Sequence, residues 1–331
     1  MVFTALILLL YAFCELWGMK RNDGSKRLLD KDTTNYLKGI CCVVVVFAHI
    51  SPAYQDSISS VVTNFGYIVI TMYFMFSAYG LMYSVHRKPG YLNGFFKNRI
   101  LILLIPYIVS VIVKYIGHLA VESGGTGFVR LLILYYIIFY LLNRFIKNEK
   151  AVFAILCLYP LVYSFVGTIF GDDLGLKSYG FGWFLESIGL LYGVVLERYY
   201  NRIQEFLCKK QKEKFILFLF ASLITGAAYV LGVKEIMFWG NYLLRIALII
   251  SIIGFVLVAT MMYQFGNKAA YFLGDISFSI FLWHGLVLQA SDRLHPNIPS
   301  GLYILINIVL ILIIAVPFHY LDNAVRKKIR G

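Results

Sequence analysis

The chain has 331 residues, of which 60% are hydrophobic and only 14% are charged. A soluble globular protein carries roughly a quarter charged residues, so this composition excludes an ordinary soluble enzyme. The net charge is +13, but the basic residues fall in short stretches between apolar runs, which is how membrane topology is encoded. We therefore expect an integral membrane protein that has the lipid bilayer, and no nucleic acid, as a partner.

The apolar runs are apolar on all sides, as in LILLLYAF near the N-terminus and INIVLILIIAV near the C-terminus. Strands of a membrane barrel would instead alternate polar and apolar residues. The pattern predicts an all-α, polytopic transmembrane helix bundle with about eleven spans. These expected spans lie near residues 2–18, 36–53, 61–84, 99–120, 128–145, 151–170, 179–198, 215–233, 242–265, 271–290 and 302–321.

The loops between the expected spans alternate in charge. The stretch KRNDGSKRLLDKD after the first span has five Lys or Arg residues, whereas SPAYQDSISS after the second has none. Basic loops stay in the cytosol, so the alternation predicts a plasma-membrane protein with its N-terminus outside and its C-terminus in the cytosol. The first span has no basic region before it and no small-residue cleavage site, so we expect a retained helix rather than a signal peptide.

Several ionisable residues interrupt the apolar spans. Such groups are costly in lipid, usually face the interior of a bundle, and are functional candidates by default. They are Glu15, Lys38, His49, Lys114, Arg130, Glu186, Arg245, Asp275, His284 and His319. Structural roles remain open, because Lys38, Arg130 and Arg245 can extend to the membrane surface, and Glu186 can pair with a cation as part of the architecture.

Lys38 and His49 lie eleven residues apart in the second span. That spacing is about three helical turns and about 16 Å, so both side chains are expected on one helix face, with Lys38 near the cytosol. Expected span directions put His284, Glu186 and Trp183 in the outer half of the bilayer, at the depth of His49. The pair on the second span therefore predicts a polar channel through much of the membrane.

Four stretches, and a fifth that adds to them, together resemble the acyltransferase-3 family of integral membrane acyltransferases. The family opens with a basic residue, ten further residues and a histidine, here Lys38 to His49. A pattern similar to F-x-x-S-G-F follows, here FMFSAY with Ser77. The stretch NRILILLIPY keeps Arg99 and the family's proline, with Leu103 where a further arginine is common.

Two later stretches extend the resemblance. SFSIFLWH, ending at His284, resembles the family's S-Y-x-I-Y-L-x-H helix, and GWFLESIGLLYG resembles its Trp-Phe-Leu helix. The resemblance implies an acyltransferase core of about ten helices at residues 29–322. One additional N-terminal helix and its linker would then occupy residues 1–28, and a basic cytosolic tail would occupy residues 323–331.

The resemblance implies an O-acyltransferase that moves an acyl group, most often acetyl, from cytosolic acyl-CoA to a hydroxyl of an extracytoplasmic sugar or polysaccharide. Glycan-assembly machinery is an expected partner, acetyl-CoA is the expected co-substrate, and no metal is expected. Such transfer needs a base, for which His49 has a suitable ordinary pKa. The other predicted catalytic residues are His284 and Glu186, and the predicted cofactor-binding residues are Lys38, Arg99, Ser77 and Trp183.

Three questions stay open from the sequence. Ser77, Trp183 and His284 are alternative donors to the oxyanion that forms during transfer. An acyl-histidine intermediate is an alternative to direct transfer. A transporter or flippase for a glycan or small polar substrate would also carry many spans and buried charges, and an inactive scaffold of a glycan-assembly complex is a third class.

Overall fold

The computed structural model describes residues 2–22, 28–119, 126–177, 182–232, 238–294 and 297–330. Parts of the expected N-terminal linker and of four expected loops fall outside these ranges. The described chain is almost entirely helical, which confirms the predicted all-α membrane bundle. The described chain has two strands of two residues each, β1 (Lys20–Arg21) and β2 (Tyr263–Gln264), which pair antiparallel to each other.

Within the described residues, eight helices are long and apolar enough to cross a membrane. They correspond to α3 with α4, the turn Phe96–Ile100 with α5, and α6, α7, α10, α12, α13 and α14. The helices are α1 (Val2–Leu16), α2 (Lys31–Ala48), α3 (Ser57–Thr63), α4 (Gly66–Arg87), α5 (Leu101–Ile116), α6 (Thr126–Phe145), α7 (Glu149–Phe170), α8 (Ile188–Arg198), α9 (Tyr200–Cys208), α10 (Gln211–Val230), α12 (Phe238–Met262), α13 (Lys268–Arg293) and α14 (Ser300–Arg330), with short 3-10 turns at Pro52–Tyr54 and Tyr91–Gly94.

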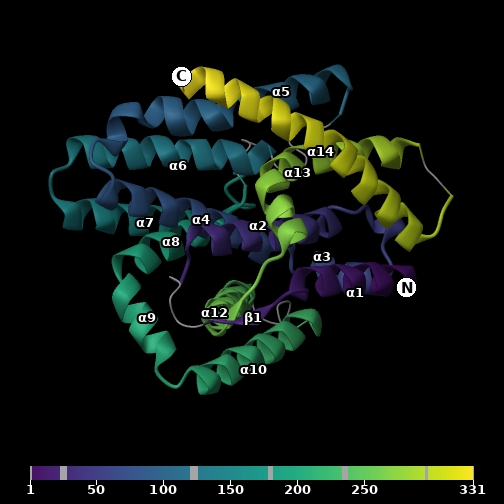
Figure 1. The fold of residues 1–331 in the computed structure, drawn as a ribbon, viewed down its shortest axis with the longest axis horizontal. Coiled ribbons are helices and arrows are strands. Elements are labelled where there is room, and N and C mark those ends of the chain that lie inside the picture. Colours follow the sequence, from purple (N-terminus) through teal and green to yellow (C-terminus); the bar gives the residue numbers. More distant parts are fainter. Residues whose placement is uncertain are drawn as a thin grey trace.

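The long helices α4, α6 and α7 run in nearly the same direction, along the horizontal of Figure 1. The α6–α7 loop and the α8–α9 junction lie together at the left of that view. We call this the basic end of the bundle, because the sequence NRFIKNEK and the start of ERYYNRIQEF occupy it. The N-terminus lies at the opposite end, whereas the last turns of α14 reach toward the basic end (Figure 1).

Helix α4 forms the centre of the bundle and is buried along most of its length. Its closest neighbour is α8, where two glycines let the two backbones touch. A Cβ on Gly189 would lie 2.0 Å from the carbonyl oxygen of Thr71, and one on Gly193 would lie 2.3 Å from that of Met75. Small residues permit this close approach between membrane helices, so the α4–α8 contact depends on the two glycines.

Replacing Gly193 with leucine is therefore expected to destabilise the protein severely, because the new side chain would collide with backbone that cannot move aside. The matched control is Gly80→Ala in α4, since an added Cβ at Gly80 meets nothing within 4 Å. We expect the control to leave the melting temperature in detergent unchanged or slightly raised, because alanine is the better helix former. Equal melting temperatures for both variants would contradict this description of the contact.

The first helix is fastened to the rest of the bundle through Asp56. The Asp56 carboxylate caps α3 by accepting from the backbone amide of Ser59 at 2.9 Å, and it accepts from the Thr4 hydroxyl at 2.5 Å. Burial raises the pKa of this carboxyl, but those hydrogen bonds outweigh burial and hold the pKa below its ordinary value. Asp56 thus stays ionised at neutral pH and ties α1 to α3.

The stretch 199–214, expected from the sequence to be an internal loop, contains the helix α9. Its buried residues are Tyr200 and Leu207, seven positions apart, while Arg202 and Glu205 are exposed. That spacing gives a short helix with one apolar face. Helix α9 runs across the direction of α6 and α7 at the basic end (Figure 1), as a helix lying along a membrane surface would.

Candidate active site

Two parallel helices, α2 and α13, carry the histidines that the sequence singled out. Near the basic end the helices are in backbone contact: a Cβ on Gly39 would lie 2.9 Å from the carbonyl oxygen of Ala270, and one on Gly274 would lie 2.1 Å from that of Asn35. Ten residues further along each helix stand His49 and His284. Both helices rise about 1.5 Å per residue, so ten residues cover the same distance along each helix from the glycine contact. The two histidines therefore lie at the same level.

The two imidazole rings are neighbours. Their centroids are 4.7 Å apart and their planes meet at 66°, an edge-to-face arrangement. His49 follows the last residue of α2 as its C-cap, so the helix ends where the histidine stands. His284 is fully buried within α13. The structure therefore brings two of the three predicted catalytic residues into direct contact.

Backbone carbonyls fix the tautomers of both rings. The Nδ1 atom of His49 lies 2.9 Å from the carbonyl oxygen of Val45, and that of His284 lies 3.2 Å from the carbonyl oxygen of Ile280. A carbonyl oxygen only accepts, so each Nδ1 carries a hydrogen and donates it. In a neutral ring the Nε2 lone pair is then left to accept a proton, and among the described side chains His284 Nε2 has no hydrogen-bond partner.

A cavity of about 320 Å³ lies on the basic-end side of the histidine pair. Three of the four residues predicted to bind the cofactor line it, namely Lys38 from α2, Ser77 from α4 and Arg99 from the turn before α5. Residues far apart in the sequence, such as Lys38 and Arg326, thus meet around one space, because α13 and α14 complete its wall. The cavity combines cationic groups with apolar side chains, which suits an anionic ligand that has an apolar arm.

Arg99 is held by its local structure. It belongs to a single π-helical turn, Phe96–Ile100, which inserts an additional residue per turn and is a frequent feature of functional sites. Its Nε donates to the Tyr91 hydroxyl at 2.7 Å. The two terminal nitrogens of the guanidinium take no part in this hydrogen bond. Across the cavity, Asn35 donates to the carboxylate of Asp275 at 2.9 Å, and both residues line the same space.

Aromatic rings separate this cavity from the histidine pair. Phe281 lines the cavity, and its ring centroid lies 5.8 Å from that of His284, one helical turn along α13. Phe128 packs edge-to-face on Phe281 at 4.8 Å, and Tyr73 lies 5.6 Å from the same ring. A single layer of aromatic side chains thus stands between the cationic cavity and the nearer imidazole.

The remaining two predicted site residues belong to other surroundings. Glu186 lies 3.7 Å from a terminal nitrogen of Arg245, and both side chains are largely buried. The Arg245 guanidinium also lies over the Tyr67 ring, 4.2 Å from its centroid. Trp183 adopts a left-handed backbone conformation with φ of 56° and lies against Gly127 at the start of α6. For Glu186 the geometry favours the ion-pair alternative, and neither residue lines the cavity of Lys38 and Arg99.

Arg326 is a cavity residue that sequence reasoning missed. It was assigned to a basic tail after the last span, but α14 continues to Arg330 and brings Arg326 into the cavity wall. Its guanidinium is held by Asp322 one turn earlier, at 2.6 Å. A signal was present, because the sequence from His319 to Arg330 contains neither glycine nor proline and has an i,i+4 acid–base pair that supports a helix.

Leu103 also lines the cavity. This is the position at which the resembling family commonly has a further arginine, so that family pattern would place a second cation in the same space. In this chain Arg326 reaches the cavity from α14 instead. Among the residues that the structure describes, no group of three or more His, Cys, Asp or Glu side chains is arranged to hold a metal ion.

The fold and site define a polytopic membrane protein with a cationic cavity at one end and a buried pair of imidazoles beyond it. The acyltransferase-3 family model, described as an acyltransferase domain, matches residues 33–320. The chain belongs to this family, and it is a membrane acyltransferase. Neither the curated proteins nor the solved structures contain a match.

Proposed function

We propose that this protein is an O-acyltransferase that moves an acyl group, in the first instance acetyl, from cytosolic acyl-CoA to a hydroxyl of an extracytoplasmic sugar or polysaccharide. One observation carries the proposal: Lys38 and Arg99 line a single cavity, and the contacting imidazoles of His49 and His284 stand further along the same helix pair. This arrangement supports a path in which cations bind the nucleotide of the donor and a base lies further along the same route.

The basic end is the proposed cytosolic side, because Lys and Arg gather in cytosolic loops. Acyl-CoA would enter there with its phosphates on the guanidiniums of Arg99 and Arg326 and the ammonium of Lys38. Guanidinium binds phosphate through two parallel hydrogen bonds, so the arginines give orientation as well as charge. The thin pantetheine arm would then pass the aromatic layer at Phe281 and bring the thioester to the histidines.

His49 is the proposed general base. Its Nδ1–H is held by the carbonyl of Val45, so Nε2 takes the proton from the acceptor hydroxyl while the oxygen attacks the thioester carbonyl. A carbon–oxygen bond forms, the carbon–sulfur bond breaks, and the imidazolium returns the proton to the departing CoA thiolate. An acyl group carried transiently on Nε2 would give the same products in two steps.

His284 supports this chemistry from the adjacent helix. Its ring contacts that of His49, and its own Nδ1–H is directed to Ile280. The proposed role is to fix the position of His49 and to stabilise charge that develops beside it. Ser77 lines the cavity below the aromatic layer, so its proposed role is to bind the donor rather than to stabilise the oxyanion.

The proposal is tested with purified protein in liposomes, using radiolabelled acetyl-CoA and surface glycan from cells that lack the protein. We expect label to pass into the glycan only when acetyl-CoA is presented on the side of the basic end. Label that enters glycan equally from both sides would contradict the proposed path. Movement of glycan across the liposome membrane without acetyl-CoA would instead support the transporter alternative.

Replacing Arg326 with glutamine is expected to raise the KM for acetyl-CoA about tenfold with little change in kcat, because a charge-assisted hydrogen bond to phosphate is lost. The control is Lys328→Gln, which removes the same charge from an exposed residue two positions further along α14 and outside the cavity. Steady-state kinetics in liposomes at several salt concentrations measure both variants. A KM that rises equally in both would assign the effect to surface charge and not to the cavity.

A further inference from the structure

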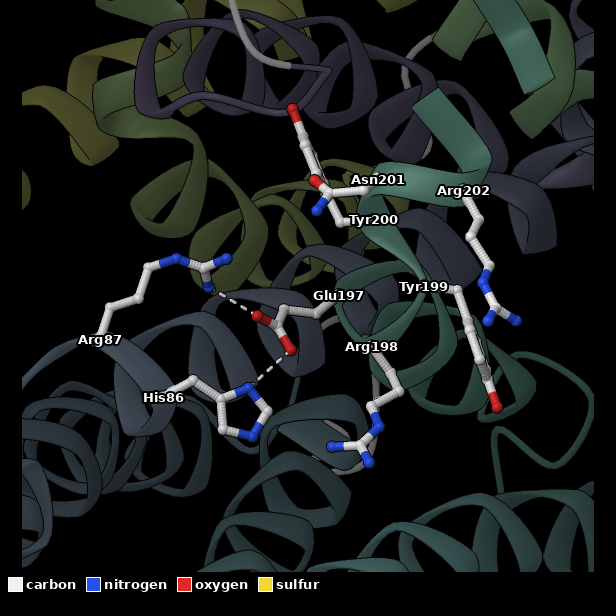
Figure 2. A pocket seen from close by; sticks show the side chains of 8 residues that line it. All are labelled: His86, Arg87, Glu197, Arg198, Tyr199, Tyr200, Asn201 and Arg202. Carbon is white, nitrogen blue, oxygen red and sulfur yellow. Dashed lines mark hydrogen bonds and ion pairs between the residues drawn. The ribbon is translucent and has the colours of Figure 1, made fainter. Parts of the chain in front are cut away.

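A second and larger cavity, of about 790 Å³, opens at the basic end. The C-terminal residues of α4 and the α8–α9 junction, residues 197–202, form its wall, as Figure 2 shows. None of these residues lines the cavity of Lys38 and Arg99. The proposed transfer reaction does not use this space.

The single acid in the wall is already neutralised. Glu197 accepts from His86 at 2.8 Å and from Arg87 at 2.6 Å, and its side chain is only 4% exposed (Figure 2). The exposed Arg87 and the buried Glu197 therefore form an ion pair that links α4 to α8. The charge that this cavity presents to a ligand comes from the other guanidiniums.

Two arginines supply that charge. A terminal nitrogen of Arg198 lies 3.8 Å from the carboxylate of Glu149. This ion pair is weak, because the two groups are far apart and the carboxylate is largely exposed to solvent. Arg202 lies over the Tyr199 ring, 5.9 Å from its centroid, and among the described residues no carboxylate pairs with it. The wall thus carries two guanidiniums whose positive charge is largely uncompensated.

The surroundings of the two arginines are those of a membrane surface. Helix α9 crosses the direction of α6 and α7 at this end (Figure 1). The side chain of Phe206 on this helix is 58% exposed, and Tyr199, which lines the cavity, is 41% exposed. Exposed aromatic side chains next to cations are typical of helices that lie among lipid headgroups.

We propose that this cavity binds the phosphate of an anionic phospholipid headgroup from the leaflet at the basic end. Arg198 and Arg202 take the phosphate through paired hydrogen bonds, and Tyr199 and Phe206 face the upper acyl chain. The shared chemistry is an anionic phosphate group, which soluble phosphates also offer. The position of α9 along the surface favours the lipid as its source.

Native mass spectrometry of the full-length protein, released from membranes that contain phosphatidylcholine with phosphatidylglycerol, tests this site. We expect the wild type to retain phosphatidylglycerol and the double variant R198Q/R202Q to retain it about tenfold less. The matched control is K209Q/K212Q, which removes equal charge from the same segment outside the cavity wall and should bind as the wild type does. The single variant R202Q, which changes an exposed side chain, serves if the double variant does not fold.

A separate arm distinguishes the sources of phosphate. Inorganic phosphate and adenosine diphosphate are titrated by calorimetry into the protein in pure phosphatidylcholine nanodiscs, and we expect no Arg202-dependent binding at millimolar concentration. Retention of phosphatidylglycerol that is equal in the wild type and R202Q, or is lost equally in K209Q/K212Q, would overturn the proposal. Arg202-dependent binding of soluble phosphate without lipid retention would overturn the lipid assignment.

Discussion

Replacing His49 with alanine is expected to lower kcat for acyl transfer at least about 100-fold, with little change in the KM for acetyl-CoA. General-base catalysis contributes about 10²–10⁴ in rate. Lys38, in the proposed donor site, lies about three helical turns before His49 in the sequence. The measurement is transfer of radiolabelled acetyl in liposomes. His49→Gln should lose activity as well, because glutamine can make hydrogen bonds but cannot take up a proton near neutral pH.

The control for this prediction is another histidine that lies outside the site. His118 is exposed and has φ of 51°, a left-handed conformation that asparagine tolerates, so His118→Asn removes an imidazole without backbone strain. We expect it to retain full activity. Activity of His49→Ala within threefold of the wild type, with an unchanged melting temperature, would remove His49 from the mechanism.

Replacing Arg99 with glutamine is expected to raise the KM for acetyl-CoA about 10- to 100-fold while kcat changes little. A charge-assisted hydrogen bond is worth about 1.5–3 kcal/mol, and the loss falls on binding because the phosphates do not react. The matched control is Lys97→Gln, which lies in the same π-helical turn but outside the cavity wall. The measurement is steady-state kinetics over a range of acetyl-CoA concentrations.

Two further outcomes refine this second prediction. Arg99→Lys should recover only part of the affinity, because an ammonium cannot form the paired hydrogen bonds of a guanidinium. The double variant Lys38→Gln with Arg99→Gln should lose less than the sum of the single losses if both cations hold the same phosphate. A normal KM in Arg99→Gln, or a fall in kcat alone, would mean that this cavity does not bind the nucleotide.

Hydropathy and spacing predicted most of the fold. The apolar runs predicted a helix bundle, which is confirmed, but they predicted about eleven spans, whereas the described residues contain eight helices of the required length and character. The positions of Lys38 on α2 and of His284 on α13 also followed from the sequence, whereas His49 is the C-cap of α2 and not part of a helix that continues to residue 53. What the sequence did not contain was the register between α2 and α13, which depends on the backbone contact of Gly39 and Gly274 and is visible only in three dimensions.

Other features were beyond sequence reasoning for identifiable reasons. Arg326 and α9 both lie in basic segments, and a basic segment after an apolar run is first interpreted as a topology signal. Glu186 was correctly placed among buried ionisable residues, but its pairing with Arg245 depends on which of several helices become neighbours. Choosing between ion-pair and catalytic roles required that neighbour to be known.

The proposed mechanism requires a nucleotide-binding cavity and a catalytic imidazole in series along α2. An electron cryomicroscopy structure with a non-hydrolysable acetyl-CoA analogue tests it most directly. We expect the phosphates of the analogue to lie against Arg99 and Lys38, its pantetheine arm to pass a displaced Phe281, and its acetyl carbonyl carbon to lie within about 4 Å of His49 Nε2. An analogue bound elsewhere, or one whose acetyl group lies apart from both histidines, would contradict it.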